Sequence, residues 1–223
     1  MPADVLLGAT GQPEPDTHVQ VSPKVLYFGM PVALISSQNP DGTPNLAPMS
    51  SVWSLGYTLM LGLGADGQKT LLNLERQGEL VLNLPGPDIW ESVESLAGLT
   101  GSNPVPEVMR AFSRFEPNKF EAAGLTPQSS MKVSPPRVAE CGLQLEAVVT
   151  RINRIGPDRD IAAVEAEVVQ VHAWPEIMVP KSDYIDTDVW RPLVYSFRHY
   201  FTLADRELGA SFKEKEPTVR AGR

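Results

Sequence analysis

Residues 45–51 have the sequence Asn-Leu-Ala-Pro-Met-Ser-Ser, and residues 67–70 have the sequence Gly-Gln-Lys-Thr. The first stretch predicts a strand that ends in two adjacent hydroxyls, and the second predicts a loop that leads into a short helix. Because a helix N-terminus offers free N–H groups and the positive end of a dipole, an anion near Lys69 and Thr70 would be stabilised. Hydroxyls of Ser50 and Ser51 would add hydrogen bonds. The two stretches therefore predict two walls of an anion-binding cleft; the alternative is that they are ordinary surface residues.

Strand patterns surround the first stretch. An apolar run at residues 32–35 is followed by the turn signal Asn-Pro-Asp-Gly-Thr-Pro at residues 39–44, which predicts a hairpin that returns along residues 45–53. In the next strand, residues 57–64, leucines alternate with Gly62 and Gly64. Two glycines on one face indicate either a bend or the close approach of another group.

The rest of the chain mixes short helices with strands. A helix is predicted at residues 70–76, with Gly78 at its end, and a strand at 79–84. The stretch at 88–125 has the character of a helical insertion, with helices expected at 88–97 and 106–112 and one turn at 121–123. After a loop at 126–137, two strands alternate at 143–149 and 164–169 as in a half-exposed antiparallel sheet, and a last strand is predicted at 193–203.

These elements predict a mainly β fold, a β-barrel with added helices. A doubly wound sheet is not expected, because the strands do not alternate regularly with long helices. No Gly-x-Gly-x-x-Gly fingerprint follows a strand and no Walker loop is present. We expect a flexible N-terminal arm at residues 1–21, one domain at 22–205 with its insertion at about 88–125, and a C-terminal tail at 206–223.

Composition narrows the function. The net charge of -8 argues against binding to nucleic acid or to an anionic membrane through a broad basic face. Cys141 is the single cysteine, which excludes an intrachain disulfide and fits a reducing cytoplasm. No Cys or His cluster has the spacing of a metal site, and no catalytic side-chain nucleophile is evident.

Several motifs, in order along the chain, together resemble the flavin reductase-like family, whose members have an FMN-binding split barrel and include flavoprotein oxygenases and flavoredoxin-like proteins. The motifs are Pro-Val-Ala-Leu-Ile-Ser at 31–36, Asp-Gly at 41–42, residues 45–51, Lys69-Thr70 with Asn73, Val-Leu-Asn-Leu at 81–84, Pro-Pro-Arg-Val-Ala-Glu-Cys at 135–141 with Glu146, and Arg-His-Tyr at 198–200. The resemblance covers roughly residues 22–205.

The resemblance implies a homodimer with one FMN near the cleft of each subunit. It implies that residues 45–51 lie along the flavin ring and its phosphoribityl chain, and that Lys69 and Thr70 face the phosphate. His199 is expected to donate to the flavin or to a nicotinamide, to act as a proton source, or to be an ordinary core or interface residue. The cofactor-binding residues implied are Asn45, Ala47, Pro48, Met49, Ser50, Ser51, Lys69, Thr70 and His199.

The implied activity is an oxidoreductase that uses FMN and oxidises NADH or NADPH, most simply a flavin reductase, with the flavin carrying the chemistry. Two alternatives remain open: an FMN-binding electron carrier, and a flavoprotein oxygenase that acts on a small organic substrate. A partner oxygenase would fit the first activity. The sequence leaves the choice of nicotinamide and the final electron acceptor undecided.

Overall fold

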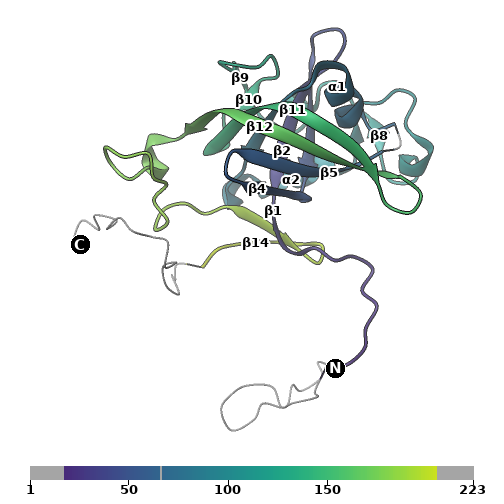
Figure 1. Ribbon diagram of the computed structural model, residues 1–223, viewed down its shortest axis with the longest axis horizontal. Coiled ribbons are helices and arrows are strands. Elements are labelled where there is room, and N and C mark those ends of the chain that lie inside the picture. The colour runs from purple at the N-terminus through teal and green to yellow at the C-terminus, as the bar shows by residue number, and fades with distance from the viewer. Residues whose placement is uncertain (1–17, 66, 205–223) are drawn as a thin grey trace.

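The computed structural model describes residues 18–65 and 67–204 (Figure 1). Its centre is a seven-stranded antiparallel sheet in the order β3-β2-β6-β11-β12-β5-β4. The strands are β2 (Ala33–Gln38), β3 (Pro44–Met49), β4 (Val52–Leu55), β5 (Thr58–Gly64), β6 (Glu79–Leu84), β11 (Leu143–Ile155) and β12 (Ile161–Ala173).

The sheet curls into a barrel. Its two edge strands, β3 and β4, follow one another in the chain and are separated only by Ser50 and Ser51. The backbone N–H of Gly62 on β5 donates a 2.7 Å hydrogen bond to the Ser51 carbonyl, which ties this corner to the neighbouring strand. The predicted class, mainly β with added helices, is confirmed as a split barrel.

Helices pack against β2 and β3 (Figure 1). Helix α1 (Lys69–Gln77) contacts both strands, and α2 (Trp90–Ala97) and α3 (Lys119–Ala122) contact β3. Gly78 ends α1 with φ 72°, the left-handed conformation predicted for it. Three single turns of 3-10 helix complete the set: η1 (Pro87–Ile89), η2 (Glu107–Met109) and η3 (Pro175–Ile177).

The insertion is less helical than predicted. The helix expected at 106–112 is only the single turn η2. Its apolar side chains Val108 and Phe112 stay exposed, so no tertiary packing stabilises a longer helix. The turn expected at 121–123 begins earlier, at Lys119. Two short parallel strands, β7 (Leu99–Thr100) and β8 (Arg114–Phe115), also lie within the insertion.

The segment at 193–203 is a hairpin rather than the single strand predicted. Strands β13 (Leu193–Ser196) and β14 (His199–Thr202) pair with each other, and β13 also pairs with β1 (Phe28–Pro31). The turn residues Phe197 and Arg198 have φ values of 43° and 71°. Such angles favour Gly or Asn, so the sequence carries no ordinary turn signal here.

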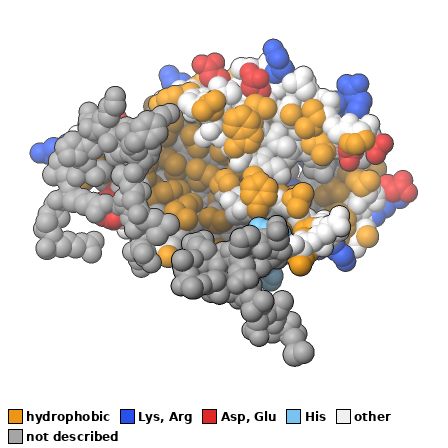
Figure 2. Space-filling model, turned by 60° about the horizontal axis from the view of Figure 1, so that its bottom comes forward, with side chains coloured by type: hydrophobic (Ala, Val, Ile, Leu, Met, Phe, Trp, Pro, Cys, Tyr) orange, Lys and Arg blue, Asp and Glu red, His pale blue; other side chains and the backbone are white. Residues whose placement is uncertain are grey.

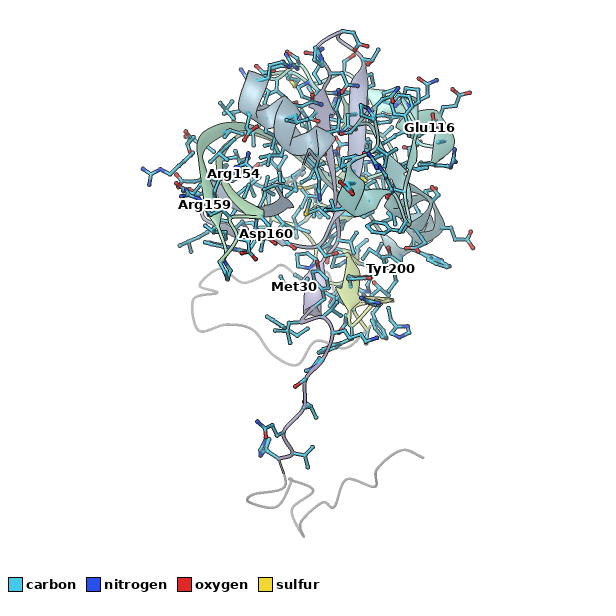
Figure 3. The ribbon with its side chains drawn as sticks, turned by 90° about the vertical axis from the view of Figure 1, so that its right-hand side faces the viewer. Met30, Glu116, Arg154, Arg159, Asp160 and Tyr200 are labelled. Atoms are coloured by element: carbon cyan, nitrogen blue, oxygen red, sulfur yellow. The ribbon has the colours of Figure 1, made fainter. Side chains whose placement is uncertain are left out.

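One further pair of strands was not predicted. Strands β9 (Pro127–Gln128) and β10 (Arg137–Val138) pair within the segment expected to be a loop. Figure 3 shows Met30 and Tyr200 together on the small three-stranded sheet of β1, β13 and β14, below the barrel.

Two apolar clusters hold these layers together. Leu59, Leu61 and Leu63 point into the barrel, as the alternation predicted. A second cluster, which includes the buried Cys141, lies between the barrel wall and helices α2 and α3. Within the described residues, no helix is long and apolar enough to span a membrane. The arm at 1–21 and the tail at 206–223 lie largely or wholly outside the described residues.

Candidate functional site

The two predicted walls of the anion site meet in the fold. The side-chain amide of Asn45 on β3 donates to Thr70 Oγ1 on α1 at 3.2 Å and to Ser37 Oγ on β2 at 3.3 Å. Asn73, one turn further along α1, also donates to Ser37 Oγ, at 3.1 Å. All four side chains are buried, so this polar network fixes the start of α1 against the barrel wall.

One atom of the network is unsatisfied. Asn45 Oδ1 is buried and has no hydrogen-bond partner among the described residues. It faces Gly101, where an added Cβ would lie 2.6 Å from Asn45 Oδ1 and 3.0 Å from Lys69 Cγ. A buried acceptor without a partner carries a free-energy cost, and Asn45 lies directly behind Gly101, which lines the smaller cavity described next.

Lys69 is the first residue of α1 and lines two cavities. One cavity, of about 600 Å³, is bounded mainly by residues 102–108, and the other, of about 330 Å³, by residues 39–43 and 101–103. Lys69 makes no salt bridge to any described residue. Hydrogen bonds from Thr43 lower the pKa of Asp41, and the Lys69 charge adds to that effect. The negative Asp41 therefore shares the smaller cavity with Lys69.

The start of α1 is open to an anion. Gln68, the N-cap residue, makes no side-chain hydrogen bond to the first turn. The first N–H groups of a helix have no partner within the helix, and together with Lys69 they make this end electropositive. Because Thr70 is buried and its oxygen accepts from Asn45, its side chain supports the wall more than it faces either cavity.

The β11–β12 hairpin braces the loop that leads into α1 (Figure 3). Arg154 Nη1 donates to the Ala65 carbonyl at 3.2 Å, and Ala65 N–H donates to the Asp160 carbonyl at 2.7 Å. Arg154 also forms an ion pair with Glu75 of α1, 2.5 Å between Nη2 and Oε1. These contacts hold the loop before α1, and through Glu75 the second half of the helix, from a segment far away in the sequence.

The glycines of β5 lie close to residues of neighbouring segments. A Cβ at Gly62 would lie 3.1 Å from Ser51 Cβ, and a Cβ at Gly64 would lie 2.0 Å from Gln68 Nε2. Of the two alternatives that the sequence left open, Gly62 fits close approach, because Ser51 covers it directly; at Gly64 the neighbour is the flexible end of the Gln68 side chain. The corner formed by Ser50 and Ser51 is therefore adjacent, through β5, to the residue that precedes Lys69.

The remaining predicted residues are divided between two places. Ala47, Pro48 and Met49 are half-buried on β3, and Met49 packs against the barrel core. His199 lines a different cavity, which is formed by α2 and the β13–β14 hairpin and shares no lining residue with either Lys69 cavity. Within one chain, residues 45–51 and residues 69–70 therefore lie close to each other. His199 and Lys69 line different cavities.

Sequence reasoning missed residues 101–103. Gly101 and Asn103 line cavities beside Lys69, and the Ser102 hydroxyl donates to the Gly67 carbonyl at 2.7 Å. The run Gly-Ser-Asn-Pro at 101–104 is a turn signal, which marked a loop but did not indicate where that loop lies.

Glu146 organises a second region. Its buried carboxylate accepts hydrogen bonds from the backbone N–H groups of Met131 (2.8 Å), Lys132 (2.5 Å) and Val133 (3.2 Å), and it lies 2.7 Å from His172 Nε2. Desolvation acts to raise the pKa of Glu146, but these backbone hydrogen bonds and His172 outweigh it, so its pKa is lowered. The carboxylate holds the loop after β9 against the barrel and faces none of the cavities described.

Comparison with known proteins identifies the family. The model of the flavin reductase like domain matches residues 25–204. This chain belongs to the flavin reductase-like family. It is 41% identical over 197 residues to the uncharacterized protein YdfE of Bacillus subtilis (strain 168), a match that covers 88% of this chain and 94% of that protein.

Solved structures share the fold of this family member. Flavoredoxin of Desulfovibrio vulgaris (Miyazaki F) superposes with a TM-score of 0.72 at 16% identity, covering 90% of this chain and 100% of the other. Nitrilotriacetate monooxygenase component B from Bacillus cereus superposes with a TM-score of 0.67 at 20% identity, covering 92% and 98%. Identities this low establish the fold alone, and the split barrel is that fold. With the family match, they support a flavin-related oxidoreductase.

Proposed function

We propose that this family member binds FMN and oxidises NADH or NADPH, most simply as a flavin reductase. The observation that carries the proposal is the position of Lys69. It has no ion pair with any described residue, and it lies between two cavities at a helix start without a side-chain cap. A phosphate is the ligand group that such a site stabilises best. Family membership supplies the flavin to which that phosphate would belong.

The residues fit such a group. Lys69 would supply the charge for the phosphate, with Thr70 behind it as the buried link to β3. Asn45 Oδ1, which lacks a partner among the described residues, would accept a hydrogen bond from a hydroxyl of the ribityl chain. The hydroxyls of Ser50 and Ser51 and the backbone near Ala47, Pro48 and Met49 would border the chain and the ring.

A bound flavin supplies hydride chemistry at its N5 atom, and the protein supplies binding, orientation and electrostatics. Backbone N–H groups near the ring would stabilise negative charge on it, as oxyanion-binding groups do. His199 stays a predicted contact of the flavin or nicotinamide. In one chain it lines the cavity of the β13–β14 hairpin, which shares no lining residue with the Lys69 cavities.

A homodimer belongs to the same proposal. Figure 2 shows a face on which many apolar side chains reach the surface. Trp53 and Leu55 on β4 and Tyr57 in the following turn are 56%, 76% and 69% exposed, and β4 contacts β1, where Phe28 is 73% exposed. An apolar area of this kind is typical of a subunit interface. We place the dimer in the cytoplasm, in agreement with the single cysteine.

The alternatives differ in what reduces the flavin. Resemblance in fold to a flavoredoxin favours an electron carrier, and resemblance to a monooxygenase component B favours a reductase that serves a partner oxygenase. The deciding experiment is the absorbance spectrum of the purified protein with FMN, followed by anaerobic addition of NADH or NADPH. Rapid bleaching of the flavin band supports the reductase. A bound flavin that neither nucleotide reduces would favour the carrier.

A further inference from the structure

The cavity beside the β13–β14 hairpin, which we call the hairpin pocket, is separate from the Lys69 cavities. It has a volume of about 810 Å³, within the range of small-molecule sites. Its lining comes from the start of α2 and from the hairpin: Pro87, Trp90, Glu94, Leu193, Tyr195, Arg198, His199, Tyr200, Phe201 and Thr202.

Aromatic rings form the walls of the hairpin pocket. The ring centroids of Trp90 and Tyr200 are 6.0 Å apart, and those of Tyr200 and Tyr195 are 5.2 Å apart. Tyr27 supports Tyr195 from behind with an edge-on contact at 5.5 Å. Side chains that already pack on one another lose little conformational freedom on binding, so they provide a prepared surface for a planar ring.

The polar groups of the pocket differ in whether they already have a hydrogen-bond or ion-pair partner. The Tyr200 hydroxyl donates a hydrogen bond to Glu94 Oε2 at 2.8 Å, so the Glu94 carboxylate already has a partner. In the described part of the chain, the Arg198 guanidinium forms no ion pair or hydrogen bond, and the Tyr195 hydroxyl forms no hydrogen bond. Arg198 thus offers a free planar fork of donors.

The backbone at Arg198 is strained. Phe197 and Arg198 both have positive φ in the two-residue turn, and non-glycine residues in this region are strained. The turn is held from outside by a 2.6 Å hydrogen bond from Phe197 N–H to the Tyr27 carbonyl. The strained turn places Arg198 and His199 at the mouth of the pocket, beside the Tyr195 ring.

We propose that the hairpin pocket binds a planar aromatic carboxylate, with its ring against Trp90 and Tyr200 and its carboxylate at Arg198 and Tyr195. The fork of Arg198 matches the two oxygens of a carboxylate, and the Tyr195 hydroxyl adds a third donor. The charge of Glu94 acts on Tyr195 as well as on an anion, so the carboxylate lies toward Arg198. A purely aliphatic acid would lose the stacking, and an uncharged aromatic amide would lose the charge.

The test is calorimetric titration of the full-length protein, loaded with FMN where it binds, with benzoate, benzamide and cyclohexanecarboxylate. We expect benzoate to bind more tightly than either of the others. Arg198→Gln should raise the benzoate Kd about tenfold or more, since a charge-assisted pair is lost. Tyr195→Phe, which keeps the ring, should raise it severalfold. Arg114→Gln, an exposed arginine on β8, is the matched control and should leave the Kd unchanged.

The proposal does not depend on the FMN proposal. Lys69→Ala should weaken FMN binding and leave benzoate binding intact, whereas Arg198→Gln should weaken benzoate binding. Equal binding of benzoate and benzamide would overturn the proposal, as would absence of benzoate binding at millimolar concentration. An unchanged benzoate Kd in an Arg198→Gln protein that melts normally would also overturn it. Should that variant fail to fold, an unchanged Kd in Tyr195→Phe overturns it.

Discussion

The side-chain amide of Asn45 donates a hydrogen bond to Thr70 Oγ1 at 3.2 Å, across 25 positions of sequence. This contact joins β3 to the first turn of α1, and it leaves Asn45 Oδ1 directed toward Gly101 without a partner among the described residues. The residues that hold α1 against the barrel are thus adjacent to residues that would contact a ligand. Substitutions must therefore be chosen to separate effects on stability from effects on binding.

Lys69→Ala should weaken FMN binding by about 1–3 kcal/mol, roughly a 5- to 150-fold rise in Kd, because a charge-assisted contact to the phosphate is lost. Fluorescence titration of the flavin-free protein measures the change. Lys132→Ala removes an exposed lysine on the loop held by Glu146 and serves as the control. An affinity equal to that of the control would remove Lys69 from the flavin site.

Gly101→Ala should both destabilise the protein and reduce FMN affinity. The new Cβ would lie 2.6 Å from Asn45 Oδ1 and 3.0 Å from Lys69 Cγ, so the loop or the lysine must shift. We expect an overpacking cost of about 1–3 kcal/mol in the free energy of unfolding. Gly98→Ala is the matched control, since its Cβ meets only the Phe112 carbonyl at 3.6 Å. Similar melting temperatures and FMN affinities in the two variants would contradict the assigned close approach.

The lowered pKa of Glu146 predicts a specific loss of stability in acid. Since the folded-state pKa lies below the unfolded value near 4.5, the stabilisation is fully present above that value and disappears as pH falls through the folded pKa. Glu146→Gln should cost about 1–3 kcal/mol at neutral pH and flatten the decline in stability below pH 4.5.

Urea unfolding of Glu146→Gln at a series of pH values measures both effects, with Glu167→Gln on the exposed face of β12 as the control. If Glu146→Gln and the wild type lose stability in parallel below the ordinary glutamate range, the carboxylate is not the group responsible.

Leu55→Arg should convert the proposed dimer into a monomer. Burying a charge in an apolar interface costs free energy, so the arginine should disfavour the dimer. Leu55 is exposed in the single chain, so the monomer itself should keep its fold. Sedimentation velocity measures the mass, and circular dichroism checks the fold. A wild-type protein that sediments as a monomer at micromolar concentration with FMN bound would refute the homodimer.

Local patterns predicted most of the barrel. Alternation of leucines with glycines in β5, the turn signal at 39–44 and the left-handed Gly78 all act over a few residues, and each formed as predicted. The β13–β14 hairpin was missed because its turn uses Phe197 and Arg198, which have no local preference for positive φ. Its conformation is set by tertiary contacts, including the Tyr27 carbonyl.

Period, propensity and motif were enough to predict the barrel strands, the short helix that begins near Lys69 and the resemblance to a flavin-binding family. The assembled fold was needed to show that Gly101 packs against Asn45 and Lys69, that Ser51 lies over Gly62, and that His199 lines a separate pocket. Those relationships join segments distant in the chain, and the free energy that selects them comes from burial and hydrogen bonding in the assembled fold.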